Sequence, residues 1–269
     1  MRGRRPPALG LSLLPSTLLA VSIALSGGGA HAMEHSKRIA LREQVRALFQ
    51  HSYDAYIAHA FPKDVLLPLT CGGRDGWGSF SLTLIDSLDT LALMGNASEF
   101  ETRVNWVAEH VSFDVDETVS LFETTIRALG GLLSAHLLAL DPELDLMRGK
   151  YDAQGGLLPL AVDLATRLLP ALDTPTGIPY GSVNLRRGVA HDETRITCTA
   201  AAGTLSLEFG ALSRLTGDGR FEVCCAHDHS AEICLNGCHL GYAFRENVLD
   251  INTLRGQGSC ASDPCRPCG

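Results

Sequence analysis

The sequence has little positive charge. Its 22 lysines and arginines are outnumbered by 30 aspartates and glutamates, which gives a formal net charge of -8 at pH 7. An acidic chain lacks the broad basic surface that holds a phosphate backbone, so this composition argues against nucleic-acid binding. With 269 residues, 45% of them apolar, the chain is long enough to bury one sizeable core.

Long apolar runs are absent after the first 32 residues, so no transmembrane segment is expected there. At the N-terminus, basic residues precede an apolar run over 9–25, and small residues follow up to Ala32. This order is typical of a cleaved signal peptide. Pro15 and the glycines at 27–29 shorten the run below the roughly 20 residues that span a bilayer, which disfavours an uncleaved anchor. We therefore expect residues 1–32 to be removed and the mature chain to be lumenal or secreted.

One usable sequon for N-glycosylation is present, Asn96-Ala97-Ser98. An N-x-S triplet arises by chance often enough to be weak evidence by itself. It agrees with the compartment that the signal peptide predicts, so Asn96 is a candidate glycosylation site.

Strand patterns are also scarce, and helical periodicity dominates. Apolar residues recur at spacings of three and four, which mark one buried helix face. The segments with this pattern are 36–60, 79–93, 99–110, 118–140, 157–169 and 203–215. The stretch from 61 to 73 indicates an irregular connection, and one short strand pairing is expected between 183–185 and 195–197. The pattern predicts an all-α array of antiparallel helical hairpins over residues 33–222.

The composition changes after residue 222. Seven of the nine cysteines fall in the last 46 residues, and apolar periodicity disappears. We therefore separate residues 223–269 as a divergent Cys-rich tail. Zinc-ligand residue types lie close together there, but only Cys265 and Cys268 have the CxxC spacing of a zinc knuckle. In an oxidising lumen, disulfides or an out-of-frame tail are favoured over a zinc site, and a Cys-rich metal-binding module is the weakest functional alternative.

Glu123 and Arg127 lie one turn apart in a helical segment that is otherwise rich in apolar residues. Apolar neighbours disfavour the charged form of a carboxylate, which is how a glutamate is kept able to donate a proton near neutral pH. The spacing alone favours the simpler interpretation, an ordinary surface ion pair between these two residues.

Further acids lie among apolar residues. Asp86 and Asp89 are flanked by leucines, and the pattern favours structural hydrogen bonding for both. Glycosidases work with two carboxyl groups, so Glu123 needs a distant partner. Glu208 lies in another apolar helix, where it either lines the same cavity as Glu123 or pairs with Arg214; the sequence leaves these two alternatives open.

Several motifs occur together in one order: Ser81-Leu-Thr-Leu-Ile-Asp-Ser-Leu-Asp-Thr90, Phe122-Glu-Thr-Thr-Ile-Arg127 followed by Gly130-Gly-Leu-Leu-Ser-Ala-His136, and Thr174-Pro-Thr-Gly-Ile-Pro-Tyr180. Over about residues 53–222 the chain resembles glycoside hydrolase family 47, the calcium-dependent class I α-mannosidases. Ala60-Phe-Pro, Pro68-Leu-Thr-Cys71 and Thr197-Cys-Thr-Ala200 are most similar to its ER degradation-enhancing α-mannosidase-like branch.

The resemblance implies an (α/α)7 barrel that removes α-1,2-linked mannose from N-glycans with inversion of configuration. It makes Glu123 the proton donor, acting through a water molecule, and makes Arg127 the residue that holds substrate and orients the acid; Glu208 would contact substrate. It also implies bound calcium, high-mannose N-glycans on misfolded glycoproteins as substrates for ER-associated degradation, an ER oxidoreductase as partner, and a place in the ER lumen.

The resemblance also ends at residue 222. The family's later motifs, which carry a second carboxylate, the base and the calcium-ligating threonine, do not appear, so the match covers about half of a ring. Cys71 matches a cysteine that this branch bonds to a cysteine beyond the match; Cys198 or a tail cysteine is an alternative partner. Without a base, the alternative function is a catalytically inactive protein that binds mannose glycans or client proteins.

Overall fold

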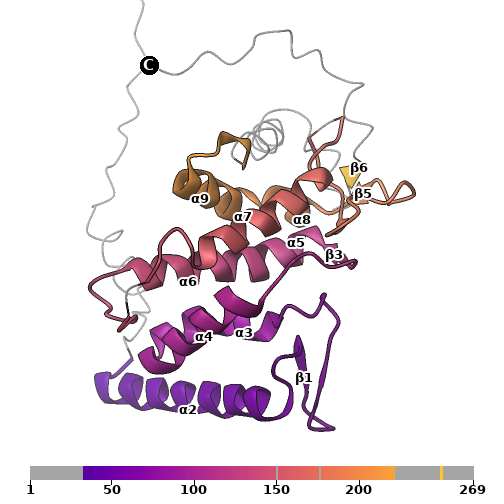
Figure 1. Cartoon of the computed structure of the whole chain (residues 1–269). Coiled ribbons are helices and arrows are strands. Elements are labelled where there is room, and N and C mark those ends of the chain that lie inside the picture. Colours follow the sequence, from indigo (N-terminus) through magenta and orange to yellow (C-terminus); the bar gives the residue numbers. More distant parts are fainter. Residues whose placement is uncertain (1–32, 150, 176, 222–248, 251–269) are drawn as a thin grey trace, which may run out of the picture. The chain divides into compact units, whose positions relative to one another are not determined.

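The computed structural model describes residues 33–149, 151–175, 177–221 and 249–250 (Figure 1). The chain divides into two compact units, Met1–Leu48 and Phe49–Gly269. Of the first unit, the structure describes only the start of helix α2 (His35–His59); the buried residues of this helix, Tyr53 and Tyr56, belong to the second unit. The predicted signal peptide and most of the Cys-rich tail lie outside the described residues.

The all-α prediction is confirmed, because a long helix occupies each of the segments that showed helical periodicity. Besides α2 these are α3 (Leu82–Leu93), α4 (Ala97–His110), α6 (Gly130–Leu140), α7 (Leu157–Leu168) and α9 (Ser206–Thr216). Shorter helical turns are α5 (Leu121–Glu123), η1 (Thr124–Leu129), η2 (Leu169–Ala171) and α8 (Thr199–Gly203). No helix among the described residues combines the length and apolarity needed to cross a membrane.

The core of the second unit lies between antiparallel helices. Helix α3 packs against α4 and α6, and α6 packs in turn against α7 and α9. The apolar face of α3 is fully buried, as the periodicity predicted. Gly131 lets α3 and α6 approach closely, since a Cβ atom there would lie 2.9 Å from Cγ2 of Ile85 and 3.0 Å from its carbonyl oxygen.

The helix predicted over 118–140 is not continuous, so this prediction was wrong in detail. Residues Thr118–Ser120 form strand β3, which pairs with β4 (Ser182–Asn184). Thr124–Leu129 is a π-helix, η1, between α5 and α6. Periodicity missed both departures because Val119 is buried in the strand as it would be in a helix, and because a π-turn changes the spacing by only one residue.

The predicted strand pairing between 183–185 and 195–197 was also wrong. Strand β4 pairs with β3, and β5 (Ile196–Thr197) pairs with β6 (Leu249–Asp250). A third pair, β1 (Val65–Leu67) with β2 (Gly72–Arg74), lies where an irregular connection was expected. Strands of two or three residues are too short to show the alternation that identifies a strand in a sequence.

A buried histidine ties the connection after α6 to both neighbouring helices. The backbone N–H of Leu157 donates to the hydroxyl of Tyr151 at 3.0 Å, and this hydroxyl lies 2.9 Å from Nδ1 of His136. The hydroxyl oxygen can accept a second hydrogen bond from a protonated Nδ1 or donate its own proton to an unprotonated one, so the contact fits either tautomer of the imidazole. Burial lowers the pKa of His136, because it disfavours the charged imidazolium.

We predict that acid destabilises the fold through His136. Its pKa is lower in the folded chain than the value of about 6.5 in the unfolded chain, so the unfolded chain takes up the proton first. Stability is then complete above about pH 6.5 and falls toward pH 5, by at most about 1.4 kcal/mol per pH unit for one proton. Urea unfolding between pH 7.5 and 5 measures this slope.

Two variants separate titration from packing in this measurement. His136→Gln should reduce the slope, because the titrating group is gone. Tyr151→Phe should lower stability at every pH by about 1 kcal/mol and leave the slope in place. An unchanged slope in His136→Gln would assign the pH dependence to other groups.

Candidate active site

The predicted catalytic acid lies at an unusual point of the backbone. Glu123 ends α5, and the π-helix η1 begins at the next residue. The hydroxyl of Ser120 accepts a hydrogen bond from the Glu123 backbone N–H at 3.3 Å and so caps this helical segment. The Glu123 side chain is half-buried. Single π-turns inside helices are frequent at functional sites, which makes this segment the first place to look for one.

Arg127 binds Asp86 and not Glu123, so the ion pair favoured by spacing alone was wrong. Its Nε and Nη2 atoms lie 2.8 and 2.5 Å from Oδ2 of Asp86 on α3. The backbone hydrogen bonds of a π-helix run from i to i+5, so residues four apart no longer lie directly above one another. Within the described part of the chain, the Glu123 carboxylate has no hydrogen bond or ion pair.

Two further carboxylates lie near Asp86. Burial raises the pKa of Asp86, and the nearby charges of Asp89 and Glu123 raise it further, while the hydrogen bond and charge of Arg127 act in the opposite direction. Asp89 accepts from the hydroxyl of Ser134 at 3.3 Å, which fits the structural role predicted for it. Asp86 has a more direct connection to the site than sequence reasoning gave it, because it holds Arg127.

Trp77 completes the surroundings of Arg127 and was missed in the sequence. The guanidinium carbon lies over the indole, 5.0 Å from the ring centroid. Trp77 lies in the loop between β2 and α3, where it is half-buried. Its only signal in the sequence is the Gly76-Trp77-Gly78 triplet, which has no periodicity and which a helical pattern therefore passes over.

Glu208 lies beside the same helical segment. A Cβ atom at Gly130, the first residue of α6, would be 3.6 Å from Cγ of Glu208 and 3.5 Å from the carbonyl oxygen of Thr125. Burial raises the pKa of Glu208. No ion pair between Glu208 and Arg214 forms among the residues described, so that alternative was wrong; Arg214 lies over Gly210 of its own helix.

Three buried polar atoms around η1 lack partners in the described structure. They are the hydroxyl oxygens of Thr124 and Thr125 and the Oε2 atom of Glu208. An unsatisfied buried polar group costs about 1–3 kcal/mol, so a region with two of them on η1 and a third on the neighbouring α9 is not arranged for stability alone. Such groups are typical of sites that bind a polar ligand or water.

The predicted glycosylation site, Asn96, and the predicted disulfide cysteine, Cys71, are not among the residues around η1. Asn96 is the N-cap of α4, where its side-chain oxygen accepts from the Glu99 N–H at 3.4 Å. Cys71 follows β1 with φ of 51° and an exposed thiol, and Cys198 is also exposed and free. A disulfide between these two, one of the predicted alternatives, is therefore not formed. The tail cysteines lie outside the described residues.

The described residues do not form the calcium site that the resemblance implies. Calcium takes six to eight oxygen ligands, mostly from carboxylates, carbonyls and water. In the described ranges, no group of three or more His, Cys, Asp or Glu side chains is placed to hold a metal ion.

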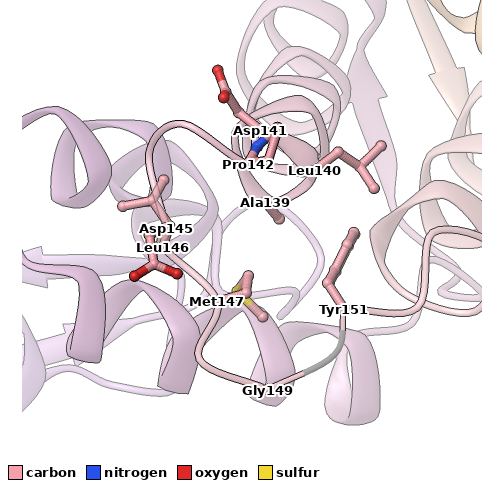
Figure 2. A pocket seen from close by; sticks show the side chains of 9 residues that line it. All are labelled: Ala139, Leu140, Asp141, Pro142, Asp145, Leu146, Met147, Gly149 and Tyr151. Carbon is pink, nitrogen blue, oxygen red and sulfur yellow. The ribbon is translucent and has the colours of Figure 1, made fainter.

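A cavity of about 320 Å³ lies at the other end of α6 (Figure 2). It is lined by Ala139, Leu140, Asp141, Pro142, Asp145, Leu146, Met147, Gly149 and Tyr151. Figure 2 shows the Asp141 carboxylate pointing away from Met147 and Tyr151. The eleven residues of α6 separate this cavity from Arg127 by about 15 Å along the helix, so it is not part of the charged site.

We predict that Glu208→Gln stabilises the fold at neutral pH. The raised pKa means that ionising Glu208 costs more in the folded chain than in the unfolded chain, so this cost appears as pH rises above about 4.3. We expect a gain of about 1 kcal/mol at pH 7 that disappears below about pH 4. Denaturant unfolding at both pH values measures it, with Glu109→Gln on the exposed face of α4 as control. A variant less stable than the parent chain at pH 7 contradicts the prediction.

Comparison with known proteins identifies the family. The sequence profile of glycosyl hydrolase family 47 matches residues 48–229. Alpha-mannosidase I MNS4 of Arabidopsis thaliana is 51% identical over 213 residues, which cover 76% of this chain and 34% of that protein. ER degradation-enhancing alpha-mannosidase-like protein 2 of Homo sapiens is 55% identical over 181 residues, 67% of this chain and 31% of that protein. The chain thus spans about a third of the length of these relatives.

A solved structure gives the same result for the fold. The alpha-1,2-mannosidase from Trichoderma reesei matches with a TM-score of 0.65 and 34% identity, over 70% of this chain and 39% of that one. The helical hairpins therefore correspond to part of the (α/α)7 barrel that the resemblance implied. On the match of the family profile and of these relatives, the chain belongs to glycosyl hydrolase family 47, in its ER degradation-enhancing α-mannosidase-like branch.

Proposed function

We propose that this chain binds high-mannose N-glycans and takes part in the removal of α-1,2-linked mannose, with Glu123 as the proton donor. The observation that carries the proposal is the pairing of Arg127 with Asp86, which leaves the Glu123 carboxylate free of an ion pair. A general acid must be able to release its proton to the leaving oxygen, and a carboxylate fixed by an arginine is held ionised. Membership of the family supports the assignment.

Arg127 has a complementary role in this proposal. Asp86 receives its Nε and Nη2 atoms, while Nη1 has no hydrogen bond to any described residue and remains available to sugar hydroxyls. The guanidinium is planar and always charged, so a fixed one presents its remaining donors in a defined direction. Glu208, with its unpartnered Oε2 atom beside Gly130, is the second group that we assign to glycan binding.

The proposed reaction inverts the configuration at the sugar. Inverting glycosidases place two carboxyl groups about 6.5 to 9.5 Å apart so that the attacking water fits between acid and base. In the described part of the chain no carboxylate has been assigned as this base. Glycan binding without hydrolysis is therefore the alternative, and separate measurements of mannose release and glycan affinity distinguish the two.

The cellular context of the proposal follows from the branch. We propose that the chain acts in the ER lumen on misfolded glycoproteins destined for ER-associated degradation. The relative from Homo sapiens is named for ER degradation enhancement, which supports this placement. The exposed thiol of Cys71 offers a point of attachment for an ER oxidoreductase.

Glu123→Gln tests the role of the acid. The amide cannot donate a proton as a carboxylic acid does, and general acid catalysis contributes typically 10²–10⁴-fold. We expect mannose release from a high-mannose N-glycan, with calcium present, to fall at least about 100-fold. Glycan affinity, measured by calorimetry, should change by less than about threefold.

Glu117→Gln makes the same chemical change at an exposed residue just before strand β3 and should leave release unchanged. Equal release by Glu123→Gln and the parent chain would remove Glu123 from the role of acid. Glycan binding without release by the parent chain would leave the binding function and exclude hydrolysis by this chain.

We further predict that Asn96 carries an N-glycan when the chain is made in a secretory pathway. Its Oδ1 atom caps α4 while Nδ2, the atom that is glycosylated, makes no hydrogen bond to the described residues. Ser98→Ala should abolish the gel shift on glycosidase treatment and keep the cap. Asn96→Asp should also abolish the shift and keep a capping oxygen. A parent chain without any shift contradicts glycosylation of Asn96.

A further inference from the structure

We propose that Trp77 is a positioning residue, whose indole face holds the Arg127 guanidinium against Asp86, and that the buried carboxylate of Asp64 holds the loop that carries Trp77. The proposal concerns the geometry of the site in the free protein. Its consequence for glycan affinity rests on the proposed function.

The guanidinium of Arg127 is held from two directions. Asp86 on α3 binds the edge that carries Nε and Nη2, at 2.8 and 2.5 Å. The guanidinium carbon lies over the Trp77 ring, 5.0 Å from the centroid. A salt bridge alone leaves a long side chain free to rotate about it, whereas an aromatic face below the plane removes that freedom. With 31% of its side chain exposed, Arg127 still reaches the surface where a ligand would bind.

Asp64 fixes the loop on which Trp77 lies. Its side chain is fully buried, and its Oδ2 atom accepts from the backbone N–H groups of Gly76, Trp77 and Ser79 at 3.1, 2.9 and 3.0 Å. Its Oδ1 atom accepts from the N–H of Leu82, the first residue of α3, at 3.3 Å. One carboxylate therefore connects the Trp77 backbone to the start of the helix that carries Asp86.

The loop adopts strained backbone conformations that this carboxylate compensates. Ser79 and Ser81 have φ values of 59° and 58°, in the left-handed region that residues with a Cβ atom rarely adopt. Such conformations persist where the surrounding structure over-determines them, and they cluster at functional sites. The four backbone hydrogen bonds to the buried Asp64 carboxylate hold the loop in these conformations.

Packing alone does not explain Trp77. The neighbouring Phe80 fills the core instead, fully buried with its ring centroid 5.1 Å from that of Phe113. Trp77 is half-buried at the edge of the core and presents its face to a cation. The chain holds an equivalent arrangement in Arg103, which lies 5.0 Å from the Phe61 centroid and binds Glu99 at 2.7 Å. That arrangement is not part of the charged site and provides a matched control.

The first test reads the geometry directly and needs no glycan. The Nε–H of Arg127 donates to Asp86, so it should give a slowly exchanging resonance in a ¹H–¹⁵N spectrum, identified by its loss in Arg127→Lys. We expect Trp77→Leu to move this resonance, because the ring current is gone, and to speed its exchange with water at least about threefold, because the side chain is no longer held against Asp86. Trp77→Phe should restore most of the protection.

Asp64→Asn and Phe61→Leu complete this test. Asp64→Asn should reproduce the faster exchange of Arg127 although it changes no atom of Trp77 or Arg127. Phe61→Leu should affect the resonance of Arg103 only. If Trp77→Leu leaves the exchange of the Arg127 Nε–H as in the parent chain, the positioning role is overturned; if Asp64→Asn leaves it so, the role of Asp64 is overturned.

The second test measures glycan affinity in a double-mutant cycle. Trp77→Leu should weaken binding of a high-mannose N-glycan about 3- to 10-fold in the parent chain, and by less than twofold in an Arg127→Lys background. Equal losses in both backgrounds would show that Trp77 acts independently of Arg127 and would overturn the proposal. If the parent chain binds no glycan while the resonance behaves as expected, the positioning role is supported and the proposed function fails.

Discussion

The ion pair between Arg127 and Asp86 is the contact on which the arrangement of the site depends. It joins α3 to the π-helix η1, and both partners keep about a third of their side-chain surface exposed. Burial raises the pKa of Asp86, and two further carboxylates add to this effect, while the hydrogen bond and charge of Arg127 oppose it. The pair therefore stabilises the helix contact less than its short distances suggest, because desolvation opposes the attraction. Its main effect is to fix a guanidinium and to leave Glu123 unpaired.

The π-helix explains why this pairing replaces the one expected from spacing. One extra residue in the turn moves Arg127 away from Glu123 and toward α3, and it places the hydroxyls of Thr124 and Thr125 in the interior without partners among the described residues. A regular α-helix would have let these threonines bond to carbonyl oxygens one turn earlier and would have paired Glu123 with Arg127. The unsatisfied threonine hydroxyls lower the stability of this segment. The same π-turn leaves Glu123 without an ion pair among the described residues.

Much of the fold could be predicted because its helices bury continuous apolar faces. Leu82, Leu88 and Leu91 recur at helical spacing and are all fully buried, as the pattern required. The site was harder, since its geometry depends on departures from regular structure. The π-turn, the three-residue strand β3 and the loop around Trp77 carry no periodic signal, so the partner of Arg127 was misassigned; the catalytic role of Glu123 and the substrate-holding role of Arg127 stay predictions. Loops that are fixed by a buried carboxylate such as Asp64 show no pattern in a sequence, because the bonds go to backbone groups.

Buried polar groups without partners gather around η1 among the described residues. Thr124 and Thr125 on η1 and Glu208 on α9 are the buried polar atoms near Arg127 that the described structure leaves unsatisfied, and Gly130 lets Glu208 approach η1. Each of them costs stability in the free protein, and a core optimised for stability alone would hold apolar residues at these positions. A sugar, which carries hydroxyl groups that both donate and accept, satisfies such atoms without introducing charge. These unsatisfied groups around η1 therefore support the proposed glycan site, independent of whether the chain also performs hydrolysis.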